Sequence, residues 1–359
     1  MDYDLWLCSI DGIGAKRLER LMNSLKTSEN VYHASREQLE KIDGISKRDV
    51  HNIVESRKKY DEMHVKDELK KYNMKCVTYF SDGYPERCRH IYNPPKRIFF
   101  RGKMPGEEVC LAVVGARNCS HYGRENARRF SACLAANGIG IISGMARGID
   151  GWAHQGALEG GGHTYAVLGN SAEICYPREH DKLYRSIWKR GGILSEYPPG
   201  TAAAPGYFPM RNRIISALSD GILVIEAREK SGSLITVEQA LEQGKDIFVI
   251  PGRVGDELSE GCNNLIKQGA FLVTAPEEIV EFYGIVYEKN TQIFRNINIF
   301  LESEEKMVYA SLSLEPKHLN VLAEELNMDS AEVMRYLFSL QRNHLIKEIG
   351  NHYYIKNVI

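Results

Sequence analysis

The sequence predicts an α/β protein with a doubly wound, mostly parallel sheet at its centre and a smaller, helix-rich domain on either side. Three observations lead to this fold class. Residues 76–285 alternate short apolar runs with amphipathic stretches, as buried parallel strands and their crossover helices do. Residues 1–75 have a helical pattern throughout, and residues 301–359 have three helical segments before a hairpin. The length of 359 residues also requires more than one domain.

The N-terminal domain, residues 1–75, contains a weak internal repeat. Two apolar-glycine-apolar turns, 10–14 and 42–46, each open a predicted helix, at Ala15–Leu25 and Lys47–Tyr60. Such turns resemble helix-hairpin-helix units, which present backbone N–H groups to DNA phosphates. The second turn lacks its final glycine, and both turns contain an aspartate. A structural or docking role is therefore favoured over DNA contact.

The core, residues 76–285, is expected to contain nine strands with helices between them. The strands are predicted at Cys76–Phe80, Ile98–Arg101, Cys110–Gly115, Gly140–Ser143, Thr164–Leu168, Ile193–Ser195, Ile222–Glu226, Ile247–Ile250 and Phe271–Thr274. The helices are predicted at Arg124–Asn137, Ile149–Glu159, His180–Lys189, Asn212–Leu218, Leu234–Gln243 and Asn263–Lys267. Ligands of such sheets bind at the carboxyl ends of the strands.

A polar linker is predicted over 286–300, and the outline of a winged helix follows it. Its helices include His318–Leu326 and Ser330–Arg342, and its hairpin ends at His352–Ile355. From residue 300 onward, six Lys or Arg face nine Asp or Glu. An acidic domain is a poor major-groove binder, so protein contact or self-association is favoured over DNA reading.

Composition restricts the possible functions. The formal net charge is −1, so any nucleic-acid site must be a local patch with salt-sensitive binding. Neither a membrane span nor a signal peptide is expected, because the chain has no long apolar run and begins with an acidic segment. The eight cysteines are scattered without a CxxC pair, which predicts no metal site and no disulfide framework. We expect a cytoplasmic protein.

The most informative segment is FPMRNRIISALSD, residues 208–220. Phe208 can stack on a flat group, and Arg211 and Arg213 can each hold an oxyanion. Asn212 supplies both a donor and an acceptor at the predicted start of a helix, where free N–H groups favour an anion. Alternatively, Arg211 and Arg213 brace the helix. This combination predicts a site for phosphate and base together.

Three other strand ends add polar groups to the same edge of the sheet. They supply Arg117 after one strand, Ser143, Gly144 and Arg147 after the next, and the loop Lys230, Ser231, Gly232 and Ser233. None of these turns is a dinucleotide fingerprint or a P-loop. We find no catalytic or metal-binding constellation and expect no cofactor. A cationic groove with an aromatic platform is typical of single-stranded nucleic-acid binding.

With these segments in view, the chain closely resembles the bacterial DNA-processing protein family DprA, also called Smf. The motifs that carry the resemblance are VVGARNCSHYG, SGMARGIDGWAHQGAL, YAVLGN, YPREHDKLY, LSEYPPGT, FPMRNRIISALSD, EKSGSLITVEQALEQGKDIFVIPG and GCNNLIKQGAFLVT. The chain departs from the family's pattern at Ala116, where the family usually has serine, and at Ala172, where a second glycine is common.

The resemblance implies a Rossmann-like core, a SAM-like N-terminal domain and a non-enzymatic role. Members of the family bind and protect single-stranded DNA, load the RecA recombinase onto it, notably during natural transformation, and dimerise through the core. Carried over by motif, the DNA pocket consists of Arg117, Ser143, Gly144, Phe208, Arg211, Asn212, Arg213 and Lys230 to Ser233. Whether the cell takes up DNA, or uses the protein in general recombination, stays open.

The alternative is a nucleotide N-glycosidase. The core also resembles the Rossmann-like nucleotide phosphoribohydrolases, whose PGGxGTxxE loop is similar to residues 231–238 here. In that interpretation Glu238 and Arg213 would be catalytic. The missing double glycine argues against it.

Overall fold

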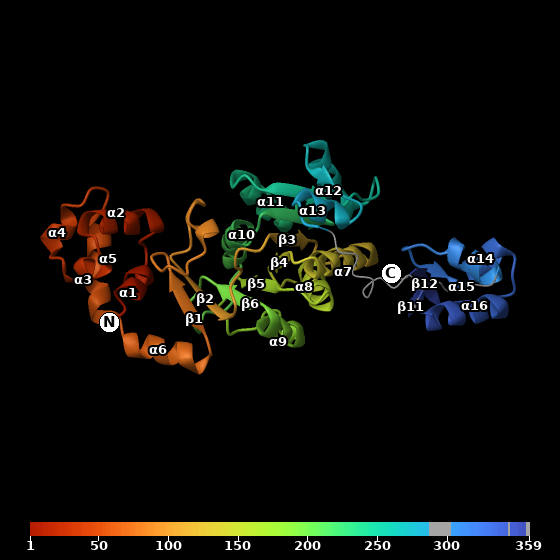
Figure 1. The fold of residues 1–359 in the computed structure, drawn as a ribbon, viewed down its shortest axis with the longest axis horizontal. Helices are drawn as coiled ribbons and strands as arrows, with labels where there is room; N and C mark the ends of the chain where they lie inside the picture. The colour runs from red at the N-terminus through yellow and green to blue at the C-terminus, as the bar shows by residue number, and fades with distance from the viewer. Residues whose placement is uncertain (287–302, 344, 357–359) are drawn as a thin grey trace.

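A nine-stranded sheet forms the centre of the protein in the computed structural model, which describes residues 1–286, 303–343 and 345–356 (Figure 1). Apart from Val286, the predicted linker 286–300 lies outside the described residues. The strands, in their order across the sheet, are β1 (Lys75–Thr78), β2 (Arg97–Gly102), β6 (Gly192–Ser195), β5 (Thr164–Leu168), β4 (Gly140–Ser143), β3 (Cys110–Gly115), β7 (Gly221–Ile225), β8 (Asp246–Val249) and β9 (Phe271–Leu272).

The sheet is doubly wound, as the sequence predicts. From β3 the chain proceeds through β4, β5 and β6 on one side, and then returns to place β7, β8 and β9 on the other side. These seven strands are parallel, whereas β1 and β2 pair antiparallel at one edge. The strand order therefore reverses between β3 and β7, and ligands of this fold class bind at such a switch point.

Helices cover both faces because the strands are apolar on both faces. Leu111 and Val113 of β3 pack in one cluster with α7 (His121–Ala136), α8 (Ile149–Glu159) and α13 (Glu277–Phe282). Ala112 and Val114 belong to another cluster, which includes α10 (Tyr207–Leu218) and α11 (Gly232–Glu242). The remaining helices of the core are α9 (Asp181–Arg190), which packs on β5 and β6, and α12 (Glu257–Lys267).

Two predicted helix starts are wrong by five residues or more. Helix α10 begins at Tyr207, not Asn212, so Phe208 lies in its first turn. Pro209 is compatible with that turn, because the first N–H groups of a helix have no intrahelical acceptor to lose. Helix α12 begins at Glu257, not Asn263. Gly261 obscures this helix in the sequence, but a Cβ there would lie 2.6 Å from the carbonyl oxygen of Ala227.

The N-terminal residues form six helices: α1 (Tyr3–Ser9), α2 (Ala15–Leu25), α3 (Ser28–His33), α4 (Arg36–Glu40), α5 (Lys47–Lys59) and α6 (Glu62–Lys71). Gly12 and Gly44 have φ values of 76° and 73°, which explains the glycine in each of the repeated turns. Both predicted helices of the repeat are present, as α2 and α5.

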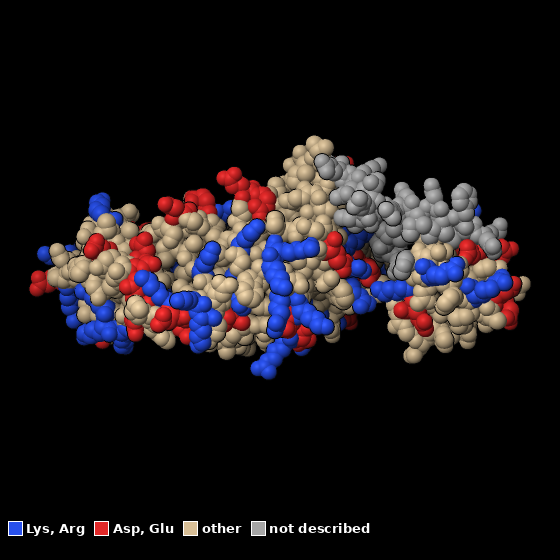
Figure 2. All heavy atoms as spheres, turned by 60° about the horizontal axis from the view of Figure 1, so that its bottom comes forward, with Lys and Arg blue, Asp and Glu red and all other residues tan. Residues whose placement is uncertain are grey.

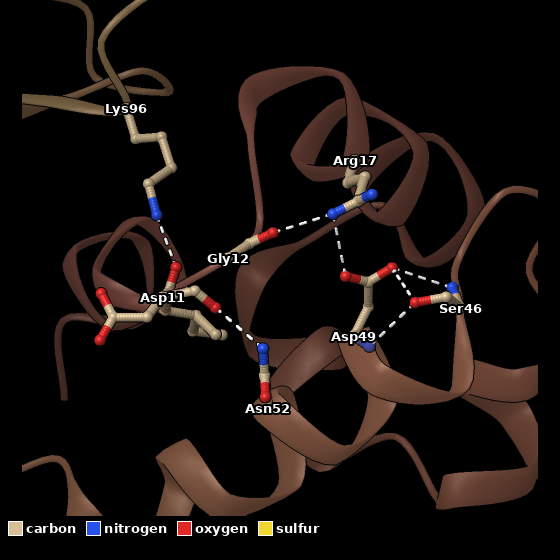
Figure 3. A network of polar contacts seen from close by, with 8 residues as sticks. Asp11, Gly12, Arg17, Ser46, Asp49, Asn52 and Lys96 are labelled. Atoms are coloured by element: carbon tan, nitrogen blue, oxygen red, sulfur yellow. Dashed lines mark hydrogen bonds and ion pairs between the residues drawn. The ribbon is translucent and has the colours of Figure 1, made fainter.

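The carbonyl groups of the first turn are bonded within the protein (Figure 3). The Gly12 carbonyl accepts from Arg17, which also pairs with Asp49 at 3.1 Å, and the Asp11 carbonyl accepts from Asn52 on α5. Lys96, from the core, donates to the Ile10 carbonyl at 2.5 Å. These contacts join the first turn to α5 and to the core.

The C-terminal residues pack around a separate apolar cluster. Helices α14 (Ser303–Ser311), α15 (Leu319–Leu326) and α16 (Ser330–Arg342) pack with a three-stranded antiparallel sheet. Its order is β10 (Lys317–His318), β12 (Tyr353–Lys356) and β11 (Ile346–Gly350). This outline is compatible with a winged helix, and the assignment stays a prediction. Within the described residues, no helix is long and apolar enough to cross a membrane.

Candidate nucleic-acid interface

A cleft of about 770 Å³ opens at the switch point of the sheet. The loops that follow β3 and β7 line it, and α10 and the start of α11 complete it. Eight of the predicted site residues line this cleft: Arg117, Phe208, Arg211, Asn212, Lys230, Ser231, Gly232 and Ser233. A smaller adjoining cavity of about 70 Å³ shares Arg117, Phe208 and Arg211 and adds Gly144 and Arg147.

Glu226, directly after β7, holds the loop after β3 by hydrogen bonds. Its carboxylate accepts hydrogen bonds from the Ser120 N–H, at 2.8 Å, and from the Ser120 hydroxyl, while its carbonyl accepts from Ala116 at 2.8 Å. Glu226 is buried and has a φ of 51°, which is uncommon for a residue other than glycine. A Cβ at position 123 would lie 2.2 Å from the Glu226 carboxylate, so Gly123 makes this close approach possible.

The loop that Glu226 holds presents Arg117 to the cleft. Arg117 is exposed, and it makes no hydrogen bond or ion pair among the residues that the structure describes. Its guanidinium lies 5.6 Å from the centre of the Phe208 ring. Arg117 can therefore bind a phosphate without giving up a hydrogen bond or an ion pair to the protein.

Phe208 also has an aromatic neighbour that the sequence did not reveal. The ring of Tyr176 stacks on it with centroids 5.7 Å apart and an angle of 29° between the planes. Tyr176 is 48% exposed and lines both cavities. A Cβ at Gly169 would lie 2.8 Å from the Phe208 ring, so this glycine allows the ring to lie against the strand end.

Arg211 is buried beneath the cleft and bonded to the protein. It is 5% exposed, and Nη1 donates to the carbonyl oxygens of Gly144, at 2.8 Å, and of Val167. Burial lowers the pKa of Arg211 to about 10, against the opposing effect of the Asp150 carboxylate, so the guanidinium stays charged at neutral pH. A Cβ at Gly144 would lie 2.5 Å from the Arg211 guanidinium.

Arg213 is also buried, and its position differs from the predicted one. It pairs with Glu196 at 2.5 Å and lines another cavity, together with Arg87 and Lys245. Both Arg211 and Arg213 thus bond to protein oxygens. This favours the alternative in which the two residues brace the helix. Ser143 is fully buried behind the cleft, where its hydroxyl donates to the Val113 carbonyl at 2.7 Å.

The loop after β7 forms the opposite wall. Lys230 is exposed and has no ion pair in the described part of the chain. Ser231 caps α11, and its hydroxyl lies 2.7 Å from that of Ser233. The helix N-terminus favours an anion beside these residues. Arg228, which the sequence prediction missed, lines the cleft as well and pairs with Glu257 at 3.3 Å.

Arg147 and the residues of the alternative enzyme lie differently. Arg147 is exposed and forms an ion pair with Glu179 at the side of the cleft. Glu238 is exposed and does not line the cleft, and Arg213 is paired elsewhere. The two residues that a glycosidase would need are therefore not brought together at this cleft. Asp150 does line the cleft, but it accepts hydrogen bonds from the N–H groups of Gly144 and Ala146.

The fold and the cleft define a doubly wound α/β protein with a cationic, aromatic-lined site at its switch point. Comparison with known families identifies it further. The chain belongs to the family of DNA recombination-mediator protein A, whose model matches residues 75–284, and a model of the SAM-like helix-hairpin-helix tandem matches residues 5–59. These matches confirm the predicted resemblance and the helix-hairpin-helix character of the N-terminal domain.

Individual relatives agree with this assignment. The chain is 47% identical over 203 residues to Protein Smf of Escherichia coli, covering 56% of this chain and 54% of that one. It is 40% identical over 221 residues to DNA processing protein DprA of Streptococcus pneumoniae, covering 61% and 77%. The chain thus matches only about half of the Escherichia coli protein.

Solved structures of relatives also superpose on this chain. The DprA structure from Streptococcus pneumoniae gives a TM-score of 0.67 at 34% identity, over 78% of this chain and 97% of that one. DNA processing protein A from Helicobacter pylori, described for its single-stranded DNA binding mode, gives 0.54 at 28% identity, over 60% and 97%.

Proposed function

We propose that the protein is a recombination mediator that binds single-stranded DNA in the switch-point cleft. The observation that carries this proposal is the joint placement of unpaired cations and stacked rings. Arg117 and Lys230 face the cleft from opposite walls. Phe208 and Tyr176 stack on each other and line both the cleft and the smaller cavity. Single-stranded DNA offers phosphates and unstacked bases at the same time, which a duplex does not.

The residues divide into two roles in this proposal. Arg117, Lys230 and the N-terminus of α11 at Ser231–Ser233 hold phosphates, and Phe208 and Tyr176 stack on a base. Asn212 can hydrogen-bond a base edge or a sugar. Gly144 and Arg147 extend the site through the smaller cavity. Ser143, Arg211 and Arg213 support it from beneath, because the Ser143 hydroxyl, Nη1 of Arg211 and Nη2 of Arg213 bond to protein oxygens.

The relatives support the choice of DNA as the ligand. The Helicobacter pylori protein is described as binding single-stranded DNA, and it covers 60% of this chain. We propose that this chain does the same and performs no chemistry on the strand. We further propose that it protects the strand and loads the RecA recombinase onto it, in transformation or in general recombination, and that it acts in the cytoplasm.

We also propose that the protein forms a homodimer through its core. Strand β9 is an edge strand that pairs only with β8. Phe271 and Leu272 on β9 are 47% and 48% exposed, and Phe282 beside them is 44% exposed. An exposed apolar edge of this kind is well suited to a second copy of the chain. The acidic C-terminal region is proposed to contact protein rather than DNA.

Fluorescence anisotropy with a labelled oligonucleotide tests the DNA proposal. Arg117→Ala should weaken binding of single strands while leaving the unfolding temperature unchanged, because Arg117 has no ion pair to lose. The matched control is Lys59→Ala, which removes an exposed cation from α5. Equal affinity of the Arg117→Ala variant and the wild type would refute the proposed site.

A further inference from the structure

The outer face of α9 carries a row of cations that the site described above does not include. Lys182, Arg185 and Lys189 are exposed, while Tyr184 and Ile187 of the same helix are buried against the sheet. The three cations are spaced i, i+3 and i+7, so they form one stripe along the helix. At 1.5 Å of rise per residue, the stripe is about 10 Å long.

Most of this positive charge has no acidic partner. Arg185 pairs with Asp181 at 2.9 Å, but Lys182, Lys189 and the preceding Arg178 form no ion pair in the described ranges. Figure 2, in which the lower side of Figure 1 comes forward, shows Lys and Arg gathered at the middle of the molecule, where α9 lies. Since the net charge of the chain is −1, this concentration is a local property.

The stripe begins at the edge of the cleft. Tyr176 and Pro177 line the smaller cavity, and the turn Arg178–His180 leads directly from them into α9. Helix α9 connects the carboxyl end of β5 to the amino end of the parallel strand β6. It therefore starts at the level of the cleft and runs back along the sheet, away from the cleft. Arg147, which pairs with Glu179, lies at the junction.

We propose that the stripe Lys182–Arg185–Lys189 binds the phosphates of a DNA single strand after it leaves the cleft past Tyr176. This inference rests on the proposed function. Charge complementarity selects a polyanion, and continuity with the stacked Tyr176–Phe208 pair selects a strand whose bases are already exposed. The stripe would increase the number of nucleotides that the protein contacts, while the bases are bound in the cleft.

Oligonucleotide length separates the two binding regions. The variant is Lys182→Ala with Lys189→Ala, and the probes are oligothymidylates of about six and about twenty nucleotides, because about six nucleotides is near the small end of single-strand site sizes. The control variant, Lys59→Ala with Lys267→Ala, removes two exposed cations from α5 and α12. Affinities are measured by anisotropy over a series of salt concentrations.

The long probe should lose affinity, and the short one should not. Each single-strand phosphate contact contributes about 0.7 to the log–log salt slope, so the slope should fall by about 1.4 and affinity by about 25-fold at 0.1 M salt. The control should bind both probes like the wild type. An equal loss for both probes, or no loss for either, would overturn the inference, and so would a loss seen only with a duplex of the same length.

The failure of this inference differs from the failure of the proposed function. If the wild type bound both probes and Arg117→Ala weakened both, an unaffected α9 variant would refute the stripe alone. If the wild type bound neither probe, the proposed function would fail as well.

Discussion

Replacing Arg211 by methionine should destabilise the protein, although this arginine belongs to the segment 208–220, which most strongly predicts DNA binding. The guanidinium is 5% exposed and donates to the Gly144 and Val167 carbonyls. Burial lowers the pKa of Arg211, and the negative charge of the Asp150 carboxylate is the main effect that opposes this fall. Methionine is similar in length and removes the charge and the donors together.

The expected magnitude follows from burial. Arg211→Met removes the donor of two buried hydrogen bonds, to the Gly144 and Val167 carbonyls, and each buried acceptor left without this donor costs about 1–3 kcal/mol. At about 2–4 °C per kcal/mol, the two losses together should lower the unfolding temperature of the core by about 4–24 °C. Arg117→Ala, an exposed change without a lost ion pair, should alter stability by less than about 0.5 kcal/mol.

The same variant has a predictable dependence on pH. Burial raises the pKa of Asp150 above its usual value, and Arg211 opposes this rise. Without Arg211, the pKa should rise further. A carboxyl whose pKa is raised in the folded state stabilises it while protonated, and this stabilisation is lost as pH increases through the raised pKa. The stability difference from the wild type should therefore be smaller at acidic pH than at neutral pH.

Thermal unfolding by circular dichroism at the two pH values, together with anisotropy at a temperature where both proteins are folded, measures these effects. A stable Arg211→Met variant that fails to bind DNA would refute this reasoning, because Arg211 would then contact the strand itself.

Three further predictions concern the stacking pair, the loop support and the dimer edge. Phe208→Ala should weaken single-strand binding by about 1–3 kcal/mol in anisotropy, and an unchanged affinity would exclude base stacking there. Glu226→Gln should lower the free energy of unfolding by about 1.5–3 kcal/mol and weaken DNA binding, because Ser120 loses a charged acceptor. Urea unfolding measures the first effect and anisotropy the second, and a variant with wild-type stability and affinity would contradict the prediction. Phe282→Glu should convert a dimer to a monomer in light scattering, whereas a persisting dimer would place the interface elsewhere.

The core strands could be predicted because their signal is local. The buried strands β3, β4 and β5 are continuous apolar runs, and the predicted bounds of all three are those of the structure. The location of the site follows from them, since the carboxyl ends of parallel strands meet at one edge of the sheet. The cleft does gather residues from four strand ends there.

The orientation of the arginines could not be predicted from the sequence. Arg117 and Arg211 have the same chemistry, yet one is exposed and the other donates to buried carbonyls. Only the packing of α10 over the ends of β4 and β5 decides this difference. Tyr176 was missed for a similar reason, because it lies in a loop without periodicity and meets Phe208 only after α10 has packed.

A salt series that compares single-stranded with duplex DNA on the whole protein tests the central claim most directly. The stacked rings of Phe208 and Tyr176 predict tighter binding of the single strand than of the duplex. The two cleft cations, Arg117 and Lys230, predict a log–log salt slope steeper than about −1.4 for the single strand. Substituting both by alanine should bring the slope toward zero by about that amount while leaving the fold intact. Equal affinity for single strand and duplex would contradict a single-strand site at the switch point of this sheet. A salt slope that stays unchanged in the doubly substituted protein would contradict it as well.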